Sequence, residues 1–113
     1  MLYDYTLMAI GSRPFRPDSI PFEDLNFWDL DKFFSAGRHL PKSIFIVGGG
    51  SVGVEFATIF AGLGVLTMIS DSADRLIHSM DTEISKLMAK HLKHIDVDII
   101  LESTTNSKRM AND

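Results

Sequence analysis

Three glycines at a fixed spacing, followed by an acidic residue, are the residues of this sequence best suited to bind a ligand. In "GGGSVGVEF", Gly48, Gly50 and Gly53 follow the spacing G-x-G-x-x-G after an apolar run. Gly48 would permit a tight turn, Gly50 would let a pyrophosphate approach the backbone, and Gly53 would let a helix lie close to a sheet. Asp71 stands directly after the next apolar run, 18 residues beyond Gly53. Together these residues predict a dinucleotide-binding loop.

The predicted loop would hold phosphates with backbone groups instead of basic side chains. The free N–H groups in the first turn of a helix, at the positive end of its dipole, attract phosphate. In this sequence that turn begins with Ser51 and Val52. The Ser51 hydroxyl could contact a phosphate, and the alternative for Ser51 is a plain helix-start residue. The chain is acidic, with a net charge of −4 and scattered Lys and Arg, so we expect no nucleic-acid partner.

Asp71 is expected to accept hydrogen bonds from the adenosine ribose hydroxyls of the dinucleotide. The same carboxylate would repel a 2′-phosphate, so it favours NAD(H) over NADP(H). Arg75 weakens this preference, because an arginine just past this strand can meet a 2′-phosphate. The alternative for Asp71 is a plain turn residue, since "DSAD" is good turn sequence.

The elements that must position these residues alternate between strand and helix. "SIFIV" (43–47) has the apolar, β-branched character of a strand buried on both faces of a parallel sheet. The elements expected after it are a helix to about Leu63, a strand at 65–70, a helix capped by Asp81 or Thr82, and a strand at 97–101. This is a Rossmann-type βαβαβ unit of the α/β class, a partial doubly wound parallel sheet. Right-handed crossovers place strand 65–70 in its middle.

Each of the two predicted helices has an apolar stripe that is expected to face the sheet. Spacings of three and four residues define both stripes. The first comprises Val52, Phe56, Ile59, Phe60 and Leu63, and the second comprises Ile84, Leu87, Met88, His91 and Leu92.

The residues before this unit are expected to form a separate segment. Tyr3 to Ile10 has the length of a short strand that ends at a glycine. Three prolines between residues 14 and 21 then predict an extended connector. "FWDLDKFFSAG" (27–37) predicts a short helix closed by Gly37, with Leu30, Phe33 and Phe34 on its apolar face.

The sequence also argues against several kinds of chemistry. It has no cysteine, so this chain alone forms no disulfide, thiolate metal site or dithiol redox centre. A helix-to-strand break would scatter the potential metal ligands His91, His94, Asp96 and Asp98, so no metal is expected. Glu55 interrupts the apolar stretch between residues 43 and 70, so no membrane span is expected. The N-terminus lacks the features of a signal peptide, which favours a cytoplasmic location.

The stretch "IVGGGSVGVEFATIFAGLGVLTMISDSADRLI" (46–77) resembles the pyridine nucleotide-disulfide oxidoreductases, whose NAD(P) domain opens with G-x-G-x-x-G-x-E-[FY]-A. "MDTEISKLMAKHL" (80–92) looks like the next helix of that domain. "LMAIGSRPFRP" (7–17) looks like the segment by which the FAD domain of the family passes into the NAD(P) domain. The sequence "GSRP" and the spacing between these motifs most resemble those of soluble pyridine nucleotide transhydrogenases and dihydrolipoyl dehydrogenases.

The resemblance implies roles for several residues. Gly48, Gly50 and Gly53 would hold the pyrophosphate and Asp71 the adenosine ribose. Glu55, one turn into the helix, would lie near the nicotinamide end of the dinucleotide, and the alternative for it is a partly exposed helical carboxylate. Residues 1–20 would be the strand and linker that end an FAD domain, and 21–113 an NAD(P)-binding domain truncated at its C-terminus.

The function implied is that of the dinucleotide-binding domain of an FAD-dependent oxidoreductase, which transfers hydride between NAD(P)H and flavin. FAD would bind only in the full-length enzyme, whose FAD and interface domains would be the partners of this chain. The chain alone is expected not to catalyse. The alternatives are a non-catalytic Rossmann module, with a binding or structural role, and a methyltransferase-like domain that binds S-adenosylmethionine.

The strand at 43–47 would be an open sheet edge in a truncated domain, and such edges promote aggregation. One expected solution is that "LMAIGSRP" (7–14) folds back beside residues 43–47. A homodimer that pairs exposed edges or apolar faces is the other.

Overall fold

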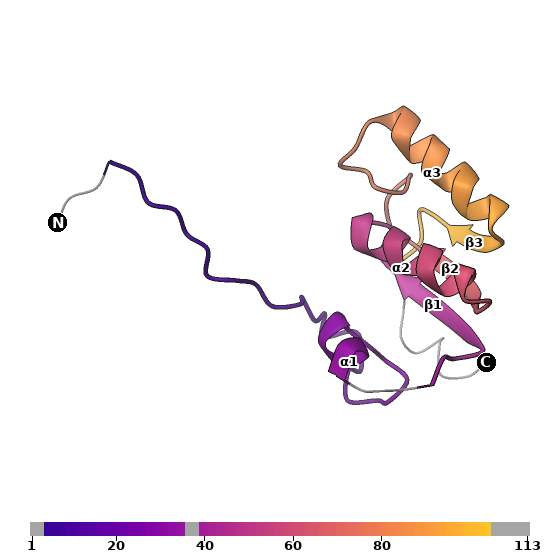
Figure 1. The fold of residues 1–113 in the computed structure, drawn as a ribbon, viewed down its shortest axis with the longest axis horizontal. Coiled ribbons are helices and arrows are strands. Elements are labelled where there is room, and N and C mark those ends of the chain that lie inside the picture. Colours follow the sequence, from indigo (N-terminus) through magenta and orange to yellow (C-terminus); the bar gives the residue numbers. More distant parts are fainter. Residues whose placement is uncertain (1–3, 36–38, 105–113) are drawn as a thin grey trace. The chain divides into compact units, whose positions relative to one another are not determined.

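The computed structural model describes residues 4–35 and 39–104. The chain divides into two compact units, Met1–Arg38 and His39–Asp113. The first contains the short helix α1, and the second contains the sheet (Figure 1). The predicted boundary at residue 20 concerns the domains of a longer parent enzyme, and it stays a prediction.

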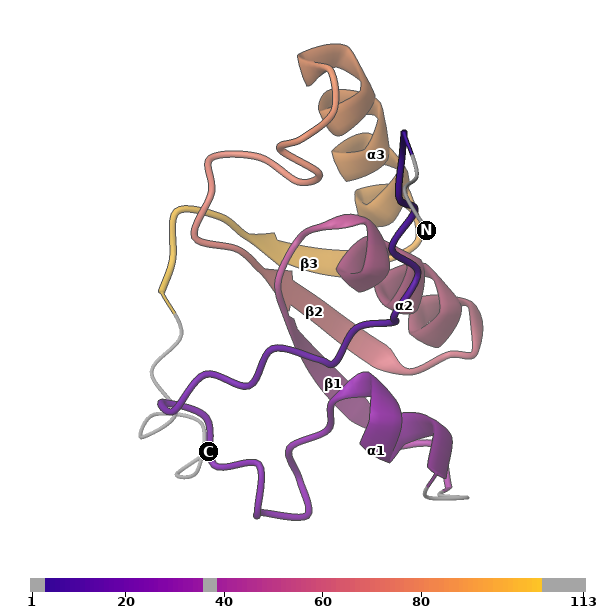
Figure 2. The ribbon, with the colours of Figure 1, turned by 90° about the vertical axis from the view of Figure 1, so that its left-hand side faces the viewer.

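The described part of the second unit is a parallel sheet with two crossover helices. Its elements are β1 (Ser43–Val47), α2 (Ser51–Gly62), β2 (Leu66–Ser70), α3 (Thr82–His94) and β3 (Val97–Ile100). Figure 2 shows the three strands side by side in the order β1, β2, β3, and both strand pairs are parallel. The predicted βαβαβ unit, its α/β class and the central place of the second strand are confirmed.

The strand register brings the loops after β1 and β2 to one edge of the sheet. Val47 pairs with Ser70, and Ser70 in turn pairs with Ile100. The Gly48 N–H donates to the Ser70 carbonyl at 2.8 Å, which carries the pairing one residue beyond β1. The glycine loop and Asp71 therefore leave the sheet side by side.

The core lies between one face of the sheet and both helices. Its buried members are Val54, Ala57, Ile69, Leu76, Ile77, Leu92 and Val97. The opposite face of the sheet has no covering helix in the described residues of this unit, and Phe45 and Val47 on it are exposed. The prediction that residues 43–47 are buried on both faces is therefore wrong here, because both crossovers lie on the same side.

The predicted buried stripe of α2 is confirmed at Phe60 and in part at Phe56, which is half-buried, and is wrong at its other three positions. The residues of α2 that are buried are Val54, Ala57 and Phe60, whereas Val52, Ile59 and Leu63 are 46%, 51% and 56% exposed. The helix is apolar on nearly every side, so its hydrophobic spacing alone does not select one face. The buried face is selected by close approach to the sheet, because the small residues Gly53 and Ala57 let their side of the helix fit against it.

The helix predicted after the strand at 65–70 is present as α3 and begins where the sequence indicates. The prediction of its buried face is only partly correct. Asp81 caps α3, since its carboxylate accepts from the Glu83 N–H at 2.8 Å. Leu92 is buried and Met88 is half-buried, as expected. Ile84, Leu87 and His91 are exposed. The small Ser85 and Ala89 face the core in their place, which lets the helix lie close to the sheet.

The N-terminal segment does not form the predicted strand. Residues 4–10 have no regular structure, and Tyr3 lies outside the described residues. Tyr5 and Leu7 are 94% and 93% exposed, so no burial offsets the entropy lost on ordering a strand. Residues 4–14 contain no strand, so the expectation that residues 7–14 add a strand beside β1 is wrong as well.

The predicted short helix is present as α1 (Leu30–Ser35). Asp29 caps it by accepting from the Lys32 N–H at 2.8 Å, and Arg16 forms an ion pair with the same carboxylate. The hydrogen bond from Lys32 and the contact with Arg16 hold the pKa of Asp29 below its ordinary value. On the predicted apolar face, Phe33 is half-buried while Leu30 and Phe34 are exposed. The expected closing residue, Gly37, lies outside the described residues.

Candidate functional site

Three consecutive glycines form the whole connection between β1 and α2. Gly48 has a φ of 111°, a left-handed backbone conformation that residues with a side chain rarely adopt. Gly50 precedes the helix as its N-cap, with φ −71° and ψ −176°. The tight turn that the sequence predicts at Gly48 is therefore confirmed.

Gly53 and Gly50 differ sharply in the space around them. A Cβ atom on Gly53 would lie 1.9 Å from the Gly48 carbonyl oxygen, so the first turn of α2 packs directly against the loop. A Cβ atom on Gly50 would meet nothing within 4 Å. The close packing expected at Gly53 is confirmed, and the open space at Gly50 fits a ligand that approaches the backbone there.

The first turn of α2 offers backbone donors to such a ligand. The first four N–H groups of an α-helix have no partner within the helix. Gly50 provides no side-chain cap, and the first turn of α2 contains no acidic residue that would offset the dipole. Ser51 and Val52, which the sequence places in the binding set, are exposed at this end of the helix. This end of α2 therefore suits an anionic group.

Asp71 lies beside the glycine loop and contacts it directly. Its Oδ2 atom accepts from the Gly49 N–H at 2.5 Å, and its Oδ1 atom accepts from the Ala73 N–H at 2.8 Å. Partial burial raises the pKa of Asp71, but the N–H groups of Ala73 and Gly49 and the charge of His78 outweigh this effect, so the pKa lies below its ordinary value. A carboxylate has about four acceptor positions. Asp71 can therefore keep both contacts and still accept from a ligand hydroxyl.

Gly49 is the residue of the site that the sequence motif does not identify. It is buried beneath the segment that follows β2, and its carbonyl accepts from the Ile77 N–H at 2.7 Å. A Cβ atom on Gly49 would lie 2.6 Å from Leu76 Cδ2 and 3.1 Å from the Asp71 side chain. The motif G-x-G-x-x-G treats this position as variable. The run of three glycines is the one sequence signal that could have indicated it.

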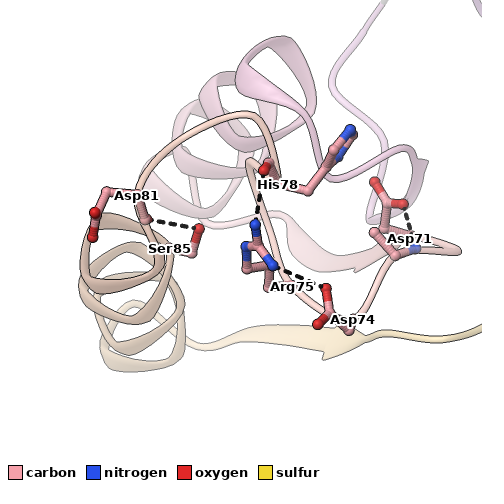
Figure 3. Close-up of polar contacts among 7 residues, drawn as sticks. Asp71, Asp74, Arg75, His78, Asp81 and Ser85 are labelled. Carbon is pink, nitrogen blue, oxygen red and sulfur yellow. Dashed lines mark hydrogen bonds and ion pairs between the residues drawn. The ribbon is translucent and has the colours of Figure 1, made fainter.

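Arg75 makes its contacts within its own loop. Its Nη2 atom donates to the His78 carbonyl at 3.0 Å, and its Nη1 atom lies 3.5 Å from Asp74 Oδ1 (Figure 3). Glu55 is exposed on the second turn of α2. The structure thus gathers Gly48, Gly50, Ser51, Val52, Gly53 and Asp71 around one loop, while Arg75 and Glu55 lie outside this group.

The described residues contain neither a metal-binding cluster nor a membrane-spanning helix. Across residues 4–35 and 39–104, no group of three or more His, Cys, Asp or Glu side chains is arranged to hold a metal ion. Within the same ranges, no helix has both the length and the apolar character needed to cross a membrane.

The parallel sheet, its two crossover helices and the glycine loop at its carboxyl edge define an α/β unit of the Rossmann type. The family model described as "Pyridine nucleotide-disulphide oxidoreductase" matches residues 1–113, and the chain belongs to this family. The family resemblance predicted from the sequence is confirmed.

Among curated relatives, the soluble pyridine nucleotide transhydrogenase of Pseudomonas fluorescens (strain SBW25) is 38% identical over 95 residues, which cover 84% of this chain and 20% of the relative. The transhydrogenase of Pseudomonas paraeruginosa (strain DSM 24068 / PA7) is 39% identical over 97 residues, 86% of this chain and 21% of the relative. The chain thus spans about a fifth of the length of these relatives.

Among solved structures, the HOCl-induced flavoprotein disulfide reductase RclA from Escherichia coli superimposes with a TM-score of 0.78. It is 28% identical, and the match covers 87% of this chain and 22% of RclA. Both the sequence and the structure comparisons therefore relate this chain to one segment of much longer oxidoreductases.

Proposed function

We propose that this chain is the nicotinamide-dinucleotide-binding domain of an FAD-dependent oxidoreductase that transfers hydride between NAD(P)H and flavin. One observation carries the proposal: the loop is closely packed at Gly53, open at Gly50, and followed by a helix end without a side-chain cap. A pyrophosphate needs this combination, because it must reach the backbone N–H groups without meeting a side chain. Relatives named soluble pyridine nucleotide transhydrogenase and a flavoprotein disulfide reductase support the reaction class.

The residues of this chain would bind and orient the dinucleotide. Gly50, Ser51 and Val52 would offer backbone N–H groups to the pyrophosphate, and Asp71 would accept from the adenosine ribose. The bound nicotinamide supplies the hydride chemistry, as cofactors do in general. In the intact enzyme Glu55, on the next turn of α2, would lie toward the nicotinamide end.

Asp71 favours NAD(H) as the ligand. Its lowered pKa keeps the carboxylate ionised near neutral pH, where it would repel a 2′-phosphate. Two unit charges about 5 Å apart repel by about 3 kcal/mol at an effective dielectric constant of about 20, which corresponds to about a hundredfold in affinity. Arg75 would offset part of this repulsion in NADP(H), but its guanidinium already contacts Asp74 and the His78 carbonyl. We therefore expect a preference for NADH of at least about tenfold.

Catalysis would need the remainder of a parent enzyme. The chain matches about a fifth of its curated relatives. FAD would be held by a separate domain, and that domain and an interface domain would be the partners of this chain. We therefore propose that the chain alone binds the dinucleotide without turning it over.

A titration of the purified chain with NADH, and then with NADPH at the same salt concentration, tests the proposal. Calorimetry is expected to show saturable binding that favours NADH and is lost in Asp71→Ala. Asp74→Ala is the matched control, because it removes the same charge from an exposed residue three positions away. Failure of the wild-type chain to bind either nucleotide would contradict the proposal.

A non-catalytic Rossmann module with a structural role is the second candidate. The observation that favours it is the sheet face on which Phe45 and Val47 are exposed, since a complete doubly wound domain covers both faces of its sheet. A chain with this function would fold cooperatively, but it would bind neither NADH nor NADPH in the same titration.

A further inference from the structure

Gly49 is held on both of its backbone groups by the segment that follows β2. Its N–H donates to Asp71 Oδ2 at 2.5 Å, and its carbonyl accepts from the Ile77 N–H at 2.7 Å. Leu76, which is fully buried, occupies the space where a side chain on Gly49 would lie. The segment 71–77 therefore clamps the middle of the glycine loop.

The clamp acts on the part of the chain that most needs ordering. Three successive glycines have more backbone freedom to lose than any other tripeptide. Gly49 lies between the turn at Gly48 and the N-cap Gly50, so the orientation of its peptide groups sets where the N–H groups of α2 point. If the loop were mobile, a ligand would have to order it on binding, and affinity would fall by that amount.

We propose that Asp71 is a positioning residue for the phosphate-binding loop: through the Gly49 N–H it orders the loop before a ligand binds, in addition to any contact with ribose. This inference rests on the proposed function of the loop. If Asp71 orders the loop, its removal should also weaken the binding of a phosphate ligand that has no ribose.

The two roles of Asp71 predict opposite results for a phosphate ligand. A carboxylate near a bound phosphate repels it, so removal of a residue that contacts ribose alone would leave pyrophosphate binding unchanged or strengthen it. Removal of a positioning residue would weaken pyrophosphate binding, because the loop loses its order. An asparagine separates these effects, since its side-chain oxygen can still accept from the Gly49 N–H without carrying a charge.

The experiment uses the isotopically labelled chain as wild type, Asp71→Asn, Asp71→Ala and the control Asp74→Ala. Inorganic pyrophosphate is the probe, and the amide signals of residues 50–53 report its binding. We expect Asp71→Ala to bind pyrophosphate about 3- to 10-fold more weakly than Asp71→Asn, the range of one net hydrogen bond. Asp71→Asn and Asp74→Ala are expected to bind at least as tightly as wild type. Binding by Asp71→Ala as tight as that by Asp71→Asn, which also lacks the charge, would overturn the proposal.

A second measurement needs no ligand. Amide hydrogen exchange at Gly49 is expected to be slow in wild type and Asp71→Asn and at least about threefold faster in Asp71→Ala, while exchange at Ile69 in β2 stays unchanged. The Ile69 signal shows that the sheet remains folded. Unchanged exchange at Gly49 in Asp71→Ala would overturn the proposal.

The two measurements also separate this inference from the proposed function. If the wild-type chain binds neither NADH nor pyrophosphate, the proposed function fails, and exchange at Gly49 alone decides whether Asp71 orders the loop. If Asp71→Ala loses NADH but keeps pyrophosphate and a protected Gly49 amide, the ribose contact stands and the positioning role is refuted.

Discussion

Replacing Gly53 by alanine would place a methyl group where the carbonyl oxygen of Gly48 already lies. The new Cβ would be 1.9 Å from that oxygen and 3.0 Å from the Gly48 carbonyl carbon, so the helix or the loop would have to move by more than about 1 Å to reach van der Waals separation. Helix propensity acts in the other direction, because alanine stabilises a helix interior by about 1 kcal/mol relative to glycine. Overpacking of a close contact costs about 1–3 kcal/mol, and here the colliding atoms belong to the backbone.

We therefore expect Gly53→Ala to lower the free energy of unfolding by about 1–3 kcal/mol, against its helix propensity. Urea unfolding followed by circular dichroism measures this change. Gly62→Ala is the matched control in the same helix, because a Cβ atom there would meet nothing within 4 Å, and it should leave stability equal or slightly higher. A Gly53→Ala chain as stable as wild type would refute the reasoning that contact with Gly48 fixes how α2 lies on the sheet.

Two further predictions concern the ligand and pH. Gly50→Ala should lower the free energy of unfolding by no more than about 1 kcal/mol, because its Cβ is in open space and only the weaker N-cap preference of alanine acts against it. It should nevertheless weaken NADH binding by at least about tenfold in calorimetry. Tight binding by this variant would contradict a backbone approach at Gly50. Since folding lowers the pKa of Asp71 from 3.8, its ionised form contributes stability that is present above about pH 4 and is lost as pH falls through the lower folded value. Urea midpoints between pH 2.5 and about 7 should therefore fall less steeply with acid in Asp71→Asn than in wild type, and identical slopes would contradict the contact.

The elements that the sequence predicts correctly are those whose signals are local. β-branched runs mark β1 and β2, and glycines mark the ends of the helix between them. The clustering of Asp71 with the loop follows in turn, because parallel strands end at the same edge of a sheet. This part of the site needs no tertiary information beyond the strand order.

What the sequence does not predict depends on contacts between distant segments. The buried face of α2 is one example, since Val52 and Val54 are equally apolar and packing at Gly53 decides between them. Residues 4–10 are another, because a strand forms only where a partner strand is present. Gly49 is a third, since its neighbour Asp71 lies 22 residues away in sequence.

The contacts of Gly49 have a consequence for how sequences of this kind can diverge. Any side chain at position 49 would collide with Leu76 and press on Asp71. A substitution at position 49 therefore requires a shifted Leu76 side chain, a smaller residue at position 76 or a displaced turn after β2. Positions 49, 71 and 76 should accordingly vary together among homologues.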